Sequence, residues 1–201
     1  MTLTGKILAR IKKKAHGWIF TPADFLDLGT PHAVGMGLLR LERLGTIRRL
    51  ARGLYEIPRH HPHIGLLSPS PDAIAHALAG RDRLQIQPSG AYAANLLGLS
   101  EQVPAQITYL TDASPRKVTI GNQTIFLLKA STRRMAAAGR TSGLVFEALR
   151  YLGKAHATMD RVASLRKLLS EKDRQQLLKD LTLAPVWMHP IIRSIADIQT
   201  S

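Results

Sequence analysis

Residues 21–45 carry the same helix-start signal twice within ten positions. Thr-Pro stands at positions 21–22 and again at 30–31, and Gly29 separates the two segments. Thr is a favoured N-cap residue, Pro suits the first position of a helix, and Gly adopts the left-handed conformation in which many helices end. The pattern predicts a helix over 22–28, a tight turn at Gly29 and a second helix over 31–44. This arrangement is typical of a helix-turn-helix.

The second helix is predicted to have one apolar face and one polar, basic face. The apolar stripe consists of Val34, Leu38, Leu41 and Leu44, which recur at helical spacing. The other face carries four candidate DNA-contacting residues, and a fifth, the N-cap residue, stands just before the helix. They are His32, Met36, Arg40 and Arg43 on the face and Thr30 at the cap. Gly35 and Gly37 each cost about 1 kcal/mol inside a helix, so we expect another surface to approach them closely.

A basic hairpin is predicted directly after this helix. Residues 47–50 and 54–57 read as strands around a turn that contains Gly53, and the hairpin carries Arg48, Arg49 and Arg52. Because side chains alternate along a strand, Arg48 and Arg49 face opposite sides, so only one of them is expected to reach DNA. A short strand at 18–20 completes a predicted winged helix-turn-helix, whose helix and wing would both face a phosphate backbone.

The first helix is predicted to begin at Thr2 or Thr4 and to end before Gly17. Its last turn carries three consecutive lysines. They are Lys12, Lys13 and Lys14. Cations are favoured at a helix C-terminus, so these lysines either form a solvated helix end or contact phosphate.

The sequence predicts a fold of class α+β with two domains. Residues 1–57 form the winged helix-turn-helix domain, and the prolines of 58–71 indicate a linker. Histidines 60, 61 and 63 in this linker lack flanking carboxylates or cysteines, which favours solvated side chains over a metal site. Residues 72–201 alternate helix and strand, with strands over 83–87 and 107–111 among them. From Gly143 onward the pattern is helical, ending in a helix over 185–198, which predicts an α+β domain ending in a helical bundle.

Charge indicates a polyanionic partner. The chain has 28 Lys and Arg against 14 Asp and Glu, a net charge of +14, and residues 1–57 contribute +6 of it. Nucleic acid is the most frequent partner of such a protein, with a membrane surface or an acidic protein as alternatives. The absence of cysteine excludes disulfides and thiolate chemistry. No secretory signal or membrane-spanning run is recognisable, so we expect a cytoplasmic protein.

Motifs for catalysis are absent from the sequence. There is no phosphate-binding glycine loop and no H-E-x-x-H, and the acidic residues of the second domain are scattered singly. Ser89 and Thr111 stand at predicted strand ends, where capping or turn roles are favoured over catalysis. We therefore expect a protein that is not an enzyme and that needs no cofactor or metal. Four basic residues of this domain either bind an anionic partner or solvate helix ends: Arg133, Arg134, Arg166 and Lys167.

Three stretches carry a resemblance to a known family. They are RGLYEIP after the Arg-bearing hairpin, PSGAYAANLLGLSEQVP, and ITYLTDASPRK. Together they resemble the DUF6088 branch of the AbiEi-like antitoxins of bacterial type IV toxin–antitoxin systems, over roughly residues 3–140. The resemblance implies an N-terminal winged helix-turn-helix that represses its own operon at inverted repeats. It also implies a C-terminal domain that neutralises a nucleotidyltransferase-like toxin encoded beside it.

Three functions compete at this point. The leading hypothesis is a DNA-binding transcriptional repressor that is also an antitoxin. The alternative is a winged-helix regulator whose second domain senses a small molecule, and the neighbouring gene discriminates between the two. A nucleic-acid-processing enzyme is the weakest hypothesis, because it needs paired metal-binding carboxylates. The operator, the toxin and the choice between a dimer and successive DNA-bound monomers are left open.

Overall fold

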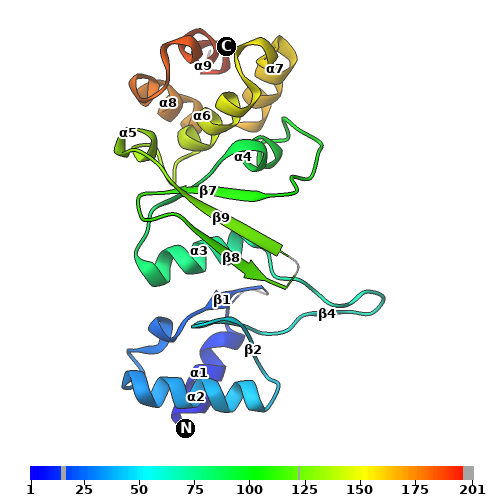
Figure 1. Cartoon of the computed structure of the whole chain (residues 1–201), viewed down its shortest axis with the longest axis vertical. Coiled ribbons are helices and arrows are strands. Elements are labelled where there is room, and N and C mark those ends of the chain that lie inside the picture. Colours follow the sequence, from blue (N-terminus) through cyan, green and yellow to red (C-terminus); the bar gives the residue numbers. More distant parts are fainter. Residues whose placement is uncertain (15–16, 122, 197–201) are drawn as a thin grey trace. The chain divides into compact units, whose positions relative to one another are not determined.

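The computed structural model describes residues 1–14, 17–121 and 123–196. The chain forms two compact units (Figure 1), of which unit 1 comprises Met1–Leu84 and Thr119–Gln123. Unit 2 comprises Gln85–Val118 and Thr124–Ser201. Each unit combines helices with strands, and the end of the described chain is helical.

Unit 1 is built on two packed helices. Helix α1 spans Leu3–Lys12 and α2 spans Pro31–Arg43, and the two pack against each other (Figure 1). Both begin at the predicted caps, where the hydroxyl of Thr2 accepts a hydrogen bond from the backbone of Gly5 and that of Thr30 accepts one from Ala33. The fully buried core between them consists of Ile7, Ile11, Phe20, Phe25, Val34, Leu38, Leu41 and Ile47.

The predicted helix over 22–28 is wrong in length. Only a 3₁₀ turn forms, at Pro22–Phe25 (η1). An α-helix would need the amide of Leu28 to donate to the carbonyl of Asp24, and this bond is not formed; that carbonyl accepts from the guanidinium of Arg10 at 2.8 Å. The Leu28 amide donates instead to the carbonyl of Phe25 at 2.9 Å, which is the tighter 3₁₀ pattern.

The predicted left-handed conformation of Gly29 is also wrong, because its φ is not positive. Gly29 is instead explained by close packing. A Cβ atom there would stand 3.2 Å from a terminal methyl of Leu3, so α1 leaves little room for a side chain at this turn.

A three-stranded sheet covers the end of this helical layer. Its strands are β1 (Ile19–Phe20), β2 (Arg48–Ala51) and β3 (Leu54–Glu56), in the order β1-β3-β2 with antiparallel pairing. Gly53 lies in the turn between β2 and β3 with φ of 70°, a conformation that L side chains rarely adopt. Residues 48–56, the predicted wing, therefore form one antiparallel hairpin.

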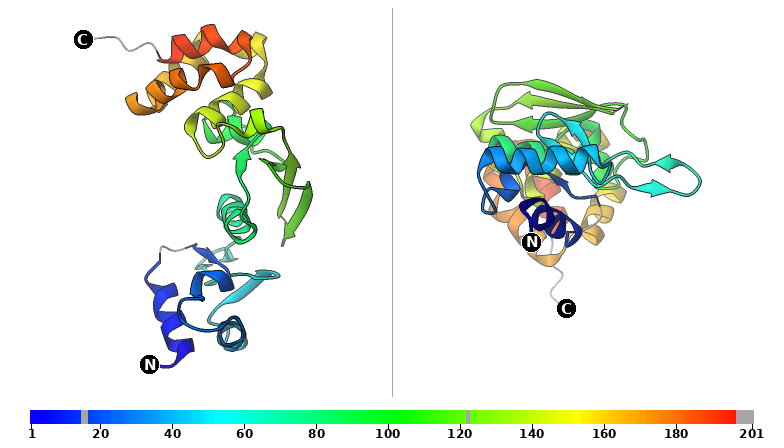
Figure 2. Two further views of the ribbon diagram at one scale, coloured as in Figure 1. Left: turned by 90° about the vertical axis from the view of Figure 1, so that its left-hand side faces the viewer. Right: turned by 90° about the horizontal axis from the view of Figure 1, so that it is seen from below.

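The predicted linker contains secondary structure of its own. Strands β4 (His60–His61) and β5 (Gly65–Leu66) pair as a short antiparallel hairpin that projects from unit 1 (Figure 2). Helix α3 (Pro71–Asp82) follows and packs against β1. The compact units thus divide after Leu84, whereas the boundaries at 57 and 72 stay predictions about independently folding domains.

Unit 2 begins with a sheet and one helix. Strands β6 (Ile86–Pro88), β7 (Ile107–Thr111), β8 (Arg116–Ile120) and β9 (Gln123–Lys129) form a sheet in the order β6-β7-β9-β8, and α4 (Gly90–Leu96) follows β6. Strand β6 is antiparallel to β7, and β7 is parallel to β9. The predicted strand over 83–87 starts too early, because Arg83 is the left-handed C-cap of α3, with φ of 54°.

The rest of unit 2 is helical. It comprises α5 (Thr132–Met135), α6 (Thr141–Leu152), α7 (Met159–Leu168), α8 (Glu171–Lys179) and α9 (His189–Ala196), with 3₁₀ turns at 154–156, 181–183 and 186–188. Helix α6 packs on α4, and α9 packs on α7 and α8 (Figure 1). The predicted last helix over 185–198 is a 3₁₀ turn followed by α9, and residues 197 and 198 lie outside the described residues. Across the described ranges, none of the helices is long and apolar enough to cross a membrane.

Candidate nucleic-acid interface

Helix α2 presents a polar face opposite its buried stripe. A turn of about 100° per residue puts His32, Met36 and Arg43 within about 40° of one another, and all three side chains are exposed. Arg40 is also exposed and lies at the edge of this face, where its guanidinium donates to the hydroxyl of Thr4 at 3.5 Å. Thr30 is exposed at the N-terminus of the helix.

The buried stripe is one residue shorter than predicted. Val34, Leu38 and Leu41 are 0–2% exposed, whereas Leu44 is 70% exposed. Leu44 is the C-cap, and the chain turns away from the core at Gly45, which has φ of 67°. The helical spacing of Leu44 therefore does not bring it into the core.

The two helix glycines have different environments. A Cβ atom at Gly37 would stand 2.9 Å from the Cδ1 of Ile7, so this glycine permits the contact between α1 and α2. No atom lies within 4 Å of the corresponding position at Gly35. The expected close approach is thus found at Gly37, and nothing in the structure explains Gly35.

The β2–β3 hairpin separates Arg48 from Arg49, as strand alternation predicts. Arg48 donates from Nε to the carboxylate of Glu56 and from Nη2 to the carbonyl of Leu67, both at 2.6 Å. The side chain of Glu56 is only 1% exposed, so the guanidinium of Arg48 compensates a buried charge. Arg49 and Arg52 are exposed near the turn.

The three lysines lie together at the end of α1. All three are exposed, and the ammonium of Lys14 lies 5.5 Å from the ring centroid of Trp18, a cation–π contact. Arg10, one turn earlier, forms a two-pronged ion pair with Asp27, with both bonds at 2.6 Å. Hydrogen bonding from Arg10 holds the pKa of the Asp27 carboxyl below its ordinary value.

Two of the four basic candidates of unit 2 are engaged within the fold. Arg134 forms two hydrogen bonds with the buried carboxylate of Glu147, at 2.8 and 2.5 Å, and these raise the pKa of the guanidinium. Arg166 donates to the carbonyl of Ser194. Arg133 and Lys167 are exposed. The four side chains therefore differ in their availability to a partner.

The two candidates for catalysis have structural partners. Ser89 is buried and donates its hydroxyl proton to Glu147 at 2.8 Å, and its side chain makes no capping bond to α4. Thr111 is fully buried at the end of β7 and accepts from the amide of Ala113 at 3.3 Å, which is a turn role. Sequence reasoning missed Glu147: Arg150, three positions later, is a local partner at 3.4 Å, whereas Ser89 and Arg134 are distant in the sequence and give no local signal.

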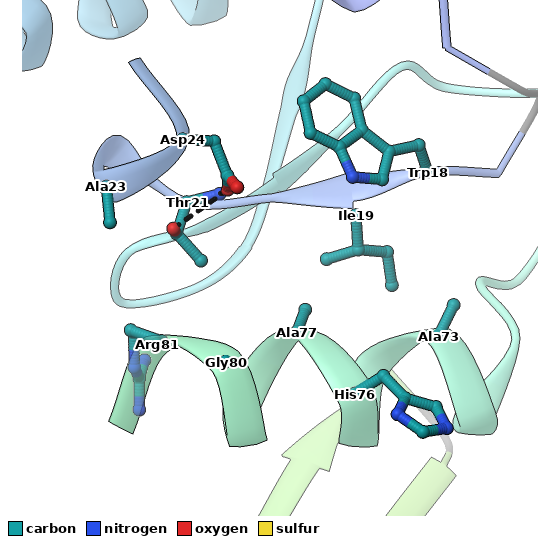
Figure 3. Close-up of a pocket in the computed structure, with 10 residues that line it drawn as sticks. All are labelled: Trp18, Ile19, Thr21, Ala23, Asp24, Ala73, His76, Ala77, Gly80 and Arg81. Atoms are coloured by element: carbon teal, nitrogen blue, oxygen red, sulfur yellow. Dashed lines mark hydrogen bonds between the residues drawn. The ribbon is translucent and has the colours of Figure 1, made fainter. Parts of the chain in front are cut away.

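The larger cavity of unit 1 has mostly apolar walls. It holds about 430 Å³ and lies between α3 and the segment that contains β1 (Figure 3). Small residues of α3 form one wall, and Thr21 and Asp24 on the other side hydrogen-bond to each other at 2.7 and 3.0 Å. Within the described residues, no group of three or more His, Cys, Asp or Glu side chains could hold a metal ion. His60 and His61 of β4 and His63 of the following turn therefore belong to no such group among these residues.

Comparisons with known proteins give a family and a distant similarity to a solved structure. A search of curated proteins gave no match. The crystal structure of the RV2827C protein from Mycobacterium tuberculosis is similar at 16% sequence identity and a TM-score of 0.46, covering 98% of this chain and 77% of that chain. The model of a family of unknown function, DUF6088, matches residues 6–177. The chain therefore belongs to the DUF6088 family.

Proposed function

We propose that residues 1–57 are a winged helix-turn-helix that binds duplex DNA. The observation that carries the proposal is the polar face of α2, where His32, Met36 and Arg43 are exposed together opposite a fully buried stripe. A helix of 13 residues is about 20 Å long, and the major groove, about 12 Å wide, admits such a helix. In this arrangement α2 is the recognition helix.

The ends of α2 and the wing supply the backbone contacts in this proposal. The free amides at the start of a helix favour anions, so phosphate binding beside Thr30 is electrostatically favourable. Arg49 and Arg52 are exposed in the wing, and cations there attract phosphates of any sequence. Arg48 has a different role, because it anchors β2 to the buried Glu56.

We further propose that the protein represses its own operon and acts as an antitoxin against a nucleotidyltransferase-like toxin. This part is supported by the resemblance of PSGAYAANLLGLSEQVP and ITYLTDASPRK to the AbiEi-like antitoxins. The protein has no catalytic role in this proposal and acts in the cytoplasm without a cofactor. Arg133 and Lys167 are the basic candidates for toxin contact, since Arg134 and Arg166 bond within unit 2.

A ligand-sensing regulator is the second candidate. It is favoured by an open cleft of about 720 Å³ in unit 2, lined by residues 98–102 and by Tyr151, His156 and Arg161 among others. Clefts of this size accommodate drug-sized molecules. A sensor of this kind would still bind DNA through α2, so the two candidates differ only in what unit 2 recognises.

The test of DNA binding uses the full chain and a labelled duplex taken from the region upstream of its gene. We expect Arg43→Ala to weaken binding by about ten- to a hundredfold, since a side chain paired with a base carries about 1–3 kcal/mol. Arg193→Ala, which removes an exposed cation from α9, serves as the matched control and should change little. Equal affinities for both variants and the wild type would contradict the assigned face.

The antitoxin role is tested separately, by co-expressing the chain with the gene next to its own. Rescue of growth from a toxic neighbour supports the antitoxin, and rescue that survives Arg43→Ala separates neutralisation from repression. A neighbour that is not toxic and not nucleotidyltransferase-like would favour the ligand-sensing regulator.

A further inference from the structure

A small cavity at the end of α1 is lined by three cationic side chains. It holds about 120 Å³ and lies entirely within unit 1. Among the residues that the structure describes, the cationic lining residues are Lys12, Lys14 and Arg59, and the other lining residues, Ile11, Gly17, Trp18 and Ile57, carry no charge. Like charges around one cavity repel, so this arrangement favours an anion between them.

Arg59 is held at this cavity by a hydrogen bond to a neighbouring segment. Its Nη2 donates to the carbonyl of Ser68 at 3.3 Å, across the base of the β4–β5 hairpin. Its Nε is buried and has no hydrogen-bond partner among the residues that the structure describes. Arg59 thus lines the cavity beside Lys12 and Lys14, with its guanidinium bonded through Nη2.

Gly17 makes room for this guanidinium. Its φ of 87° is one that L side chains rarely adopt, and a Cβ atom there would stand 3.3 Å from Cζ of Arg59 and 3.4 Å from its Nη1. A side chain at this position would press on the guanidinium. The glycine therefore serves both the turn after α1 and the placement of Arg59.

We propose that this cavity binds a phosphate group, with Arg59 as its main donor and Lys12 and Lys14 as supporting charges. Arg and Lys side chains are the usual ligands of phosphate, and their charge-assisted hydrogen bonds are about twice as strong as neutral ones. The volume exceeds the ~30 Å³ share of one water molecule and is below the ~300 Å³ of the smallest drug-sized sites. A single tetrahedral anionic group fits these limits.

The phosphate has two possible sources. One is the backbone of a DNA duplex bound through α2, and this assignment rests on the proposed function. The other is a free phosphate or a phosphorylated small molecule, which would bind whether or not the protein binds DNA. The two sources require separate measurements.

The first experiment titrates inorganic phosphate into the full chain at constant ionic strength and follows the indole ¹H–¹⁵N signal of Trp18 by NMR. We expect a saturable shift, with affinity reduced about tenfold or more in Arg59→Gln. Lys12→Gln, which changes an exposed side chain and leaves the core intact, should also weaken binding, whereas Lys179→Gln in α8 should not. A Trp18 signal that does not respond to phosphate, or responds equally in all variants, would overturn the proposal.

The second experiment measures duplex affinity against salt concentration. A lost backbone contact lowers the slope of log K against log salt by about 0.9, so this decrease in Lys12→Gln identifies DNA as the source. An unchanged slope together with phosphate binding identifies a free anion instead. If the wild type binds phosphate but no duplex, the proposed function fails while the phosphate site stands.

Discussion

The contact between Gly37 of α2 and Ile7 of α1 predicts opposite effects for two matched substitutions. Gly35→Ala and Gly37→Ala both add one methyl group inside the same helix, so each gains about 1 kcal/mol of helix propensity. The methyl at position 35 meets no atom within 4 Å. At position 37 it would lie 2.9 Å from Cδ1 of Ile7, which is fully buried.

The difference between the two variants isolates that contact. Overpacking a core costs about 1–3 kcal/mol. We therefore expect Gly35→Ala to raise the unfolding free energy of unit 1 by about 1 kcal/mol. Gly37→Ala should range from neutral to a loss of about 2 kcal/mol.

The assay is urea unfolding of the full chain in a Trp187→Phe background. This substitution lies in unit 2 and leaves Trp18 as the only tryptophan, so the emission reports unit 1. With a slope of about 1–3 kcal/mol per molar urea, a difference of 1–3 kcal/mol separates the midpoints by about 0.3 M or more.

Ile7→Val provides the control, because it removes the methyl group that Gly37→Ala would meet. In the Ile7→Val background the penalty at position 37 should fall by at least about 0.5 kcal/mol, the coupling expected of residues in contact. Equal midpoints for the two alanine variants, or additive effects in the double variant, would refute the assigned packing of α1 on α2.

Three further predictions concern the arginines of unit 1 and the ion pair of Arg10 with Asp27. Arg49→Gln should weaken binding to every duplex and lower the slope of the salt dependence by about one unit. Arg48→Gln should instead lower the unfolding free energy by about 3–5 kcal/mol, because it leaves the buried carboxylate of Glu56 unpaired. If salt titration and urea unfolding show that Arg48 changes the slope and Arg49 the stability, the roles proposed for these two arginines are wrong. Arg40→Ala should reduce discrimination between operator and random duplex, and unchanged competition binding would place it outside the base-reading face. The pKa of Asp27 is lowered by its hydrogen bond from Arg10, so its contribution to stability is present above the unfolded pKa and is lost as the pH falls through the folded pKa. Asp27→Asn should therefore flatten the acid side of the stability profile below about pH 4, and an unchanged profile would show that the ion pair contributes nothing.

The sequence by itself determined the elements that depend on local interactions. The Thr cap at position 30, Pro31 as the first residue of α2, and strand β7 over 107–111 all form as predicted, and Thr2 is the cap of α1 out of the two candidates Thr2 and Thr4. Capping and strand alternation act between residues a few positions apart, so their signals can be read from short stretches. The polar face of α2 was predictable for the same reason.

Only the tertiary structure decided how the polar side chains are used. Arg10 donates to the carbonyl of Asp24, 14 positions away, in the segment where a 3₁₀ turn replaces the predicted helix. Arg48 forms an ion pair with the buried Glu56, and Arg134 forms one with the buried Glu147. In the sequence, both arginines look like free surface cations. Local propensity contains no information on such partners, because the bonds form only once distant segments have packed together. The same holds for Arg59, whose place beside Gly17 depends on a hairpin that the sequence presents as a linker.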